Sequence, residues 1–489
     1  MDASMLRGFV QVQQASMPES PSEELYRPLT APARAIPRTY PGAPQRESFD
    51  YHRISSFSPP PSGTATPREE IDIEMSRPSS PAAPVEVVPT VWEPYMNRFR
   101  LLSAFLMSMG NALSDSAAGA LIPYMEKYYD IGYAVVSLIF VGQAIGFLVS
   151  AVALDPLRAK IGRAKLLGLA QGMLTLAYIA HCAGAPFPVI VCAFFFVGFS
   201  IGVNVAIGNL FCGGMKNGTL MLGLLHGTYG LGGTIGPLIA TAIVTSAGAI
   251  WTRYYLLTLG TAACTVVLGM WSFWGYEKEM SPTARAREST PTGSILNSMV
   301  GVIQLRVVLL GAIFIFAYQG AEVSISGWVI SFLINTRDGD PARVGYVSSG
   351  FWAGITLGRF LLSGPAQRIG EKKFVYGLTL GALVFQVLVW WVPNIIGEAV
   401  AVSFVGLLLG PIYPCATAVF MRCMTRQEAL SGIATISACG SMGGAVAPFV
   451  TGLLAQAVGT WVLHPIVIFL FVCMLGCWYC IPAEQKRTE

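Results

Sequence analysis

Two carboxylic acids lie in the middle of stretches that are otherwise long and apolar. Glu322 belongs to residues 316–334, FAYQGAEVSISGWVISFLI, within an apolar run that starts at Val307. About 20 apolar residues are enough to cross a bilayer. A carboxylate at mid-membrane depth is costly unless it faces a polar cavity or a partner. We therefore expect Glu322 either to handle a substrate or ion, or to form a buried structural bond.

Asp115 presents the same problem in the first apolar stretch, with Asn111 one helical turn before it. The alternative to a functional role is again a buried bond to a hydroxyl or amide on a neighbouring helix. If Asp115 and Glu322 face a common cavity, burial favours their protonated forms and lets them exchange protons. We expect the two acids to form the polar centre of a site, with Asn111 as a ligand of a solute.

Four further polar or aromatic residues occur inside apolar stretches. Arg359 stays charged at any depth and needs a carboxylate, for which Glu322 is the obvious partner, as a static brace or as a switch. His226 either relays protons or is a neutral histidine bonded to a neighbour. Gln319 and Trp352 suit the lining of a site for a sugar or a flat metabolite.

The composition requires many membrane-spanning elements to hold these residues. Of the 489 residues, 53% are hydrophobic and only 12% are charged, against about a quarter charged in soluble domains. We predict an all-α membrane protein with twelve transmembrane helices. The predicted spans are 99–124, 133–154, 164–184, 187–211, 219–246, 250–276, 307–334, 343–366, 373–393, 395–421, 428–457 and 460–482.

The distribution of lysine and arginine predicts the orientation. Loops on the side of the termini carry 18 of these residues, and the opposite loops carry 4. This positive-inside bias predicts that both termini are cytoplasmic. We favour the plasma membrane, with an organelle membrane as the alternative.

The chain divides by composition into five parts. Residues 1–98 hold 16 of the 31 prolines and no apolar run, so we expect a disordered cytoplasmic tail. Residues 99–276 and 307–482 form two halves of six helices each. Between them, 277–306 is a cytoplasmic central loop, and 483–489 is a short cytoplasmic tail.

The two halves repeat one another. FVGFSIG at 196–202 matches FVGLLLG at 404–410, GQAIG at 142–146 matches GITLG at 354–358, and GGTIGP at 232–237 matches GGAVAP at 443–448. Asp115 then corresponds to Glu322, 207 residues later. Four matches in one order at nearly one offset indicate a duplicated half, which is typical of transporters with a midplane site between parallel repeats.

Residues 99–482 resemble the major facilitator superfamily. The family's signature loop follows its second span, and ALDPLRAKIGRAK resembles it through Asp155, Arg158, Gly162 and Arg163. GPAQRIGEKK at 364–373 resembles the degenerate second copy. The resemblance implies two six-helix halves that rock around a central site.

Within this superfamily, GNALSDSAAG at 110–119 and YQGAEVSISGW at 318–328 resemble the fungal members of the fucose:proton symporter branch. Asp115 and Asn111 match an acid and an asparagine of that branch, and Asn209 matches a position in the fourth span. Val205 stands where the branch has a second acid. The resemblance implies proton-coupled uptake of a sugar-like solute, and the missing acid leaves export open.

Three prolines are expected to weaken helices that move. Pro237 follows a glycine-rich segment in the fifth span, and Pro411 and Pro414 interrupt the tenth span in GPIYP. Helix-breaking residues are tolerated at membrane depth where neighbouring groups satisfy the backbone. We predict hinges or gates at these positions.

We expect a transporter that moves a small polar organic solute, coupled to protons, and that works as a monomer. The alternatives are an efflux pump for a secondary metabolite or toxin, and a non-transporting nutrient receptor that signals through the tail. No catalytic motif occurs in the sequence, so we expect no enzyme activity. We likewise expect no cofactor, metal or nucleic-acid partner.

Overall fold

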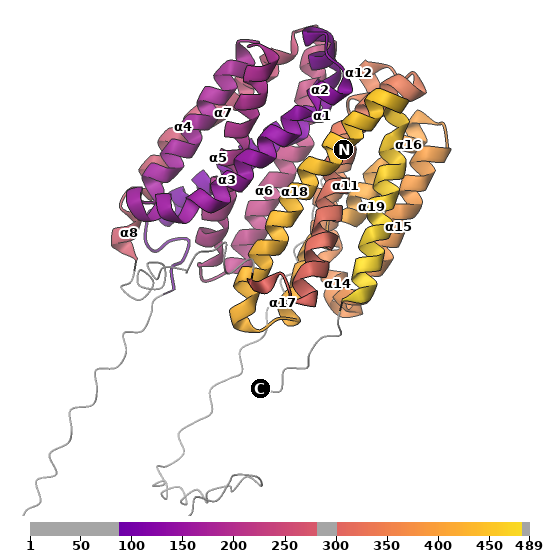
Figure 1. The fold of residues 1–489 in the computed structure, drawn as a ribbon. Coiled ribbons are helices and arrows are strands. Elements are labelled where there is room, and N and C mark those ends of the chain that lie inside the picture. Colours follow the sequence, from indigo (N-terminus) through magenta and orange to yellow (C-terminus); the bar gives the residue numbers. More distant parts are fainter. Residues whose placement is uncertain (1–87, 281–300, 482–489) are drawn as a thin grey trace, which may run out of the picture. The chain divides into compact units, whose positions relative to one another are not determined.

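The computed structural model describes residues 88–280 and 301–481, which fall in one compact unit. Within these two ranges all regular structure is helical (Figure 1). Most of the predicted tail, the centre of the predicted loop at 277–306 and the C-terminal tail lie outside the described residues.

The N-terminal half, here the helices from α1 to α7, contains six long helices, and the short α2 precedes the second of them. Short π and 3-10 segments, η1 and η2, lead into α7, and a single turn, α8, follows it. The bounds are α1 Asn97–Tyr129, α2 Tyr133–Val136, α3 Leu138–Ile161, α4 Arg163–Cys182, α5 Phe187–Gly213, α6 Gly218–Thr241, η1 Ala242–Ser246, η2 Trp251–Tyr254, α7 Tyr255–Phe273 and α8 Tyr276–Glu279.

The C-terminal half, here the helices from α11 to α19, follows the same order with two additional breaks. One separates α13 from α14 and the other separates α16 from α17. The bounds are α11 Arg306–Arg337, α12 Pro341–Val344, α13 Val347–Leu361, α14 Ser363–Ile369, α15 Glu371–Trp391, α16 Ile395–Leu409, α17 Ile412–Arg422, α18 Arg426–Val458, η3 Thr460–Val462 and α19 Leu463–Cys480.

By length and apolar composition, nine helical segments of the described ranges are able to cross a membrane. They account for nine of the predicted spans. The other three spans coincide with α1, α4 and the pair α13–α14. Helices α1 and α4 contain charged residues, and α13 is separated from α14 by a break. In α1 the charged residues include Arg100, Asp115 and Glu126. The chain is therefore an all-helical multi-pass membrane protein.

The repeated glycine motifs form one helix crossing in each half. Gly142 and Gly146 of α3 pack on the backbone of α5, and Gly198 of α5 packs on the backbone of α3 at Gln143. In the other half, Gly354 and Gly358 of α13 pack in the same way on α16, and Gly406 of α16 packs on the backbone of α13. A Cβ atom at Gly146 would collide with the carbonyl oxygen of Phe195, so only glycine permits this approach. Small residues allow such close packing in membranes, where no hydrophobic force joins helices. The repeated sequence motifs thus form the same kind of close helix crossing in both halves.

The third repeated motif pairs the inner helices. Gly232 of α6 packs on the backbone of α1 at Met109, and Gly443 of α18 packs on the backbone of α11 at Phe316. The positions in α1 and α11 are again 207 residues apart. Both pairs run side by side in Figure 1. The site-bearing helices are therefore held in equivalent ways in the two halves.

Two predicted boundaries shift. The predicted loop after residue 154 is helical as far as Ile161, so the connection between α3 and α4 is the single residue Gly162 with φ of +79°. A left-handed conformation is accessible to glycine without strain, which explains how one residue turns the chain. The first helix, α1, begins at Asn97, two residues before the predicted start of the first span at 99.

Candidate functional site

The two halves meet where α1 crosses α11. A Cβ atom at Gly119 would collide with the Ser326 carbonyl oxygen, so the two backbones touch there. Asp115 precedes Gly119 by four residues, and Glu322 precedes Ser326 by four. Each carboxylate thus lies one helical turn, about 6 Å along its helix, from the crossing. The pseudo-symmetry brings the two predicted acids to equivalent places on facing helices.

The Asp115 carboxylate accepts two hydrogen bonds from neighbouring helices. Gln143 of α3 donates from Nε2 to Oδ1 at 2.7 Å, and the Tyr229 hydroxyl of α6 donates to Oδ2 at 2.6 Å. Bonds to a carboxylate are about twice as strong as bonds between neutral groups. Both oxygens of the acid are therefore held by side chains of the N-terminal half.

In the C-terminal half a second cluster surrounds Glu322. Arg359 of α13 interacts electrostatically with Glu322 and with the Tyr318 hydroxyl, and Tyr318 interacts with both charged groups. Glu322 Oε2 is buried and accepts no hydrogen bond from the described residues. Arg359, Glu322 and Tyr318 thus lie near enough for their charges to act on one another, and the pairing of Arg359 with Glu322 stays a prediction.

Tyr229 connects the two clusters. Its hydroxyl binds Asp115, and it lies close enough to Glu322 and Arg359 of the other half for their charges to act on it. Its ring centroid is 6.1 Å from that of Trp352 of α13. The indole Nε1 of Trp352 donates to Ser326 Oγ at 2.9 Å, at the crossing itself. A polar and aromatic surface therefore runs from α1 through α6 to α13 and α11.

Gln319 and His226 border this surface on either side. The half-buried Gln319 lies on α11 against α18, where its Oε1 would contact a Cβ at Gly440 at 2.6 Å. His226 is exposed on α6, one turn before Tyr229, and interacts electrostatically with Arg359. Neither side chain is fully buried, and a contact of either one with a solute stays a prediction.

Asn111 and Asn209 lie elsewhere. Asn111 is buried, and its Oδ1 accepts from Asn204 Nδ2 of α5 at 3.1 Å. Asn204 in turn accepts from Gln171 of α4 at 2.8 Å, so Asn111 belongs to a network inside the N-terminal half. Asn209 is half-buried on α5 with its Oδ1 unbonded among the described residues.

One end of the interface between the halves is joined by additional contacts. The ring of Tyr133 in α2 is 5.8 Å from that of Trp328 in α11, and Trp328 Nε1 donates to the Pro448 carbonyl at 2.9 Å. A Cβ at Gly452 of α18 would lie 2.6 Å from Ser137 Cβ. These contacts close the end at which α2 and α12 lie.

The three predicted gate prolines sit at different kinds of position. Pro237 lies inside α6, five residues before the π-helical turn of η1. Pro411 caps α17, and Pro414 lies in its first turn, where a missing N–H is tolerated. The tenth span is broken between Leu409 and Ile412, as predicted.

The signature loop joins the helix ends on the opposite face from α2. Arg158 pairs with Asp155 one turn earlier at 3.1 Å, and the Gly162 N–H bonds back to the Arg158 carbonyl. The Arg163 N–H donates to Glu277 Oε1 at 2.7 Å, and Arg163 Nη1 lies 3.4 Å from the sulfur of Met280. The motif thus ties the start of α4 to α8, at the end of the N-terminal half.

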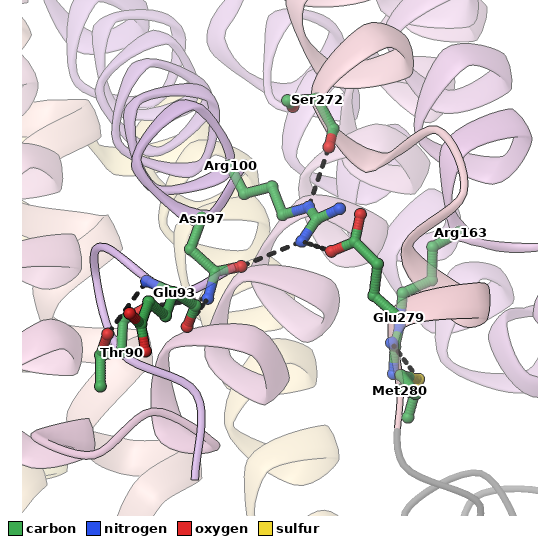
Figure 2. Close-up of polar contacts among 8 residues, drawn as sticks. All are labelled: Thr90, Glu93, Asn97, Arg100, Arg163, Ser272, Glu279 and Met280. Atoms are coloured by element: carbon green, nitrogen blue, oxygen red, sulfur yellow. Dashed lines mark hydrogen bonds and ion pairs between the residues drawn. The ribbon is translucent and has the colours of Figure 1, made fainter. Parts of the chain in front are cut away.

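A buried arginine at the same face was not expected from the sequence. Figure 2 shows the Arg100 guanidinium between Asn97, Ser272 and Glu279, with bonds of 3.0, 2.9 and 2.7 Å. The Arg100 side chain is fully buried, whereas that of Glu279 is 35% exposed. The bonds tie the start of α1 to α7 and α8, and they fix the entry of α1 into the membrane.

Four further site residues were missed: Gln143, Tyr229 as an acid partner, Tyr318 and Ser326. Gln143 carried a usable signal, because polar side chains within apolar spans mark functional positions. Tyr229 and Tyr318 gave no such signal, because aromatic residues are common at the ends of spans and in cores. Their roles depend on which helices become neighbours.

The described residues contain no cluster of three or more metal-ligating side chains.

Comparison with known proteins identifies the family. The model of the Major Facilitator Superfamily matches residues 104–395 and 323–489, which overlap and together cover most of the chain. The chain belongs to this superfamily. It is a membrane transporter of small solutes.

Two relatives match along most of their length. Bypass of stop codon protein 6 of Saccharomyces cerevisiae is 25% identical over 423 residues, covering 80% of this chain and 84% of that protein. The glucose/mannose transporter GlcP of Bacillus subtilis is 22% identical over 355 residues, covering 71% of this chain and 86% of that protein.

A solved structure has the same fold. The nucleoside transporter NupG superposes with a TM-score of 0.63 at 12% identity, over 79% of this chain and all of that chain. At this identity the similarity concerns the fold alone.

Proposed function

We propose that this transporter carries a sugar-like, hydroxyl-rich solute together with protons, at a site between the crossing of α1 with α11 and the crossing of α6 with α13. The observation that carries the proposal is the bond from Tyr229 to Asp115, on a tyrosine that also interacts with Arg359 and Glu322 of the other half. One residue thereby connects the acids of both halves.

The surroundings suit a neutral polar solute. Trp352 and Tyr229 offer aromatic faces, and Gln319, His226 and Ser326 offer hydrogen-bonding groups. Ligand sites of this kind combine an apolar lining with a few placed polar groups. The glucose/mannose transporter among the relatives supports the same solute class.

Asp115 is the proposed proton carrier. When it is ionised, Gln143 and Tyr229 satisfy both of its oxygens. When it is protonated, the attraction to these donors weakens, and Tyr229 is released toward the Arg359–Glu322 pair or toward a solute. Proton binding would thus change a contact between the halves, which is the requirement for coupling transport to a proton. Val205 in place of a second acid makes Asp115 the main carrier in the N-terminal half.

We further propose the orientation and the domain division. Both termini lie in the cytoplasm, residues 99–276 and 307–482 move as two bodies, and the end with α2 and α12 faces away from the cytoplasm. The contacts of Tyr133 with Trp328 and of Ser137 with Gly452 then close the outer side. We place the protein in the plasma membrane, within the fucose:proton symporter branch, as a working monomer.

Uptake by the purified protein in proteoliposomes tests this proposal. A panel of labelled neutral monosaccharides and of bulky apolar compounds is offered with and without an inward proton gradient. We expect accumulation of at least one sugar only with the gradient, and its loss in Asp115→Asn while solute exchange without a gradient persists. Gradient-independent accumulation, or movement of apolar compounds alone in the outward direction, would reject proton-coupled sugar uptake and favour the efflux alternative.

A further inference from the structure

An open apolar groove lies at the membrane edge of the N-terminal half, far from the candidate site. It is formed by the start of α1 and the last two turns of α7, and its lining residues are Met96, Val266, Val267, Met270, Trp271 and Trp274. Val267 is 70% exposed and Trp274 is 61% exposed. The groove runs along α7 for about 12 Å, from the membrane interface into the bilayer.

The segment before α1 contributes Met96 to the lining of this groove. Lys216 donates its N–H to the Pro89 carbonyl at 2.9 Å, and Asn97 Nδ2 donates to the Thr90 carbonyl at 2.8 Å (Figure 2). These bonds hold residues 88–96 against the end of the N-terminal half. Tyr95, next to Met96 in the chain, is exposed, and its ring lies 5.8 Å from that of Phe99.

The positively charged guanidinium group of Arg98 lies beside the groove. The Arg98 guanidinium carbon lies 3.6 Å from the ring centre of Tyr95 and 5.2 Å from that of Phe99. Phe99 in turn contacts the groove residue Trp271, with ring centres 5.0 Å apart. The charge is therefore connected to the groove through a single aromatic ring.

This charge is not neutralised within the described residues. Arg98 forms no ion pair there, and its Nε has no hydrogen-bond partner among them. Glu279, an acid of the same face, is bound to Arg100 at 2.7 Å, and Glu93 is exposed without an ion pair in the described ranges. Tyr95 and Phe99 hold the guanidinium in place by cation–π contacts, which leave its two terminal Nη groups available to an anion.

We propose that this groove binds one anionic glycerophospholipid, with its phosphate at Arg98 and an acyl chain along Val267 and Met270. Arginine is suited to phosphate because its planar fork donates two parallel bonds. A negative headgroup is favoured over a zwitterionic one because Arg98 has no acidic partner among the described residues. The proposed orientation puts the groove in the cytoplasmic leaflet, where anionic lipids are enriched.

Titration of phosphatidylserine and phosphatidylcholine into the detergent-solubilised full chain tests the site, with retained lipid counted by native mass spectrometry. We expect one tightly held phosphatidylserine, and about fivefold weaker retention in Arg98→Gln, the equivalent of ~1 kcal/mol for one basic residue. Arg98→Lys should keep most of the preference for the anionic lipid. Arg343→Gln, which removes an exposed charge at the other end of the molecule, is the matched control and should change nothing.

The groove is tested separately by Val267→Trp, which fills it from an exposed position and should not affect folding. We expect this variant to lose the bound lipid with either headgroup. Unchanged phosphatidylserine retention in Arg98→Gln, or in Val267→Trp, would overturn the proposal. Competition by free glycerol phosphate as strong as that by the lipid would show an anion site without an acyl chain and would also overturn it. None of these measurements depends on transport, so they test lipid binding independently of the proposed function.

Discussion

Gly119 of α1 lies directly against the Ser326 carbonyl oxygen of α11, and these positions are separated by the same 207 residues as Asp115 and Glu322. Equivalent residues of the two halves therefore touch at the pseudo-symmetry axis. The carboxylates of Asp115 and Glu322 lie one turn before this contact on both helices. The glycine that permits the contact and the acids that lie near it belong to one repeated pattern.

This contact predicts a conformational effect of Gly119→Ala. The added Cβ would meet the Ser326 backbone oxygen, which is unable to move like a flexible side chain. We expect the α2 and α12 end to open, with spin labels at Lys127→Cys and Arg343→Cys moving apart in double electron–electron resonance. Transport should fall with it.

Gly260→Ala is the matched control, because no atom lies within 4 Å of a Cβ placed at Gly260. In this variant the label distance and the transport rate should stay as in the parent. An unchanged distance in Gly119→Ala would mean that the crossing does not hold the closed end.

Tyr229→Phe should uncouple the protein from protons. It removes the 2.6 Å bond to Asp115 and keeps the ring beside Trp352. A hydrogen bond to a charged group contributes about 1.5–3 kcal/mol, so we expect proton-driven accumulation to fall roughly tenfold or more. Solute exchange without a gradient should fall much less. The ratio of the two rates in proteoliposomes is the measurement.

Tyr254→Phe separates coupling from general damage. The Tyr254 hydroxyl donates an equally short bond of 2.6 Å, but to the Leu113 main-chain carbonyl. We expect a stability loss of about 1 kcal/mol and no change in the ratio of driven uptake to exchange. If both tyrosine variants lowered that ratio alike, the bond to Asp115 would have no special part in coupling.

The sequence was sufficient for the parts of the fold that follow from local pattern. Apolar length predicted where helices lie, and the repeated glycines predicted the duplicated halves, because a close helix crossing requires small residues at fixed spacing. The isolated acids were found because an unpaired charge in a membrane is costly. The break at Pro411 was predicted for a similarly local reason.

The sequence did not indicate which side chains become neighbours in the folded protein. Tyr229 is 114 residues from Asp115, and Asn111 turned out to face Asn204 inside the N-terminal half. Nothing in either local sequence distinguishes these two outcomes. The continuation of α3 to Ile161 was also missed, since a charged, proline-containing stretch reads as a loop, whereas Gly162 alone makes the turn.

The proposed orientation predicts which face is reached by a membrane-impermeant maleimide. Asp338 and Lys278 are both exposed, the first between α11 and α12 and the second in α8. In intact cells we expect Asp338→Cys to be labelled and Lys278→Cys to be protected until the membrane is permeabilised. The parent chain gives the background from its native cysteines. The reverse pattern would invert the orientation and would move the lipid groove to the other leaflet.

Arg100 should be among the most sensitive positions for stability outside the candidate site. Arg100→Leu removes three bonds and leaves Asn97 buried without its partner (Figure 2). Breaking a fully buried pair costs about 3–5 kcal/mol, but Glu279 is 35% exposed and regains water, so we expect about 2–3 kcal/mol.

Arg343→Gln is the control, because its pair with Asp340 spans 3.7 Å between side chains that are 87% and 57% exposed. Such surface pairs contribute about 0–1 kcal/mol, so thermal unfolding of this variant should match the parent. Equal effects of the two substitutions would mean that burial does not set the strength of the Arg100 contacts.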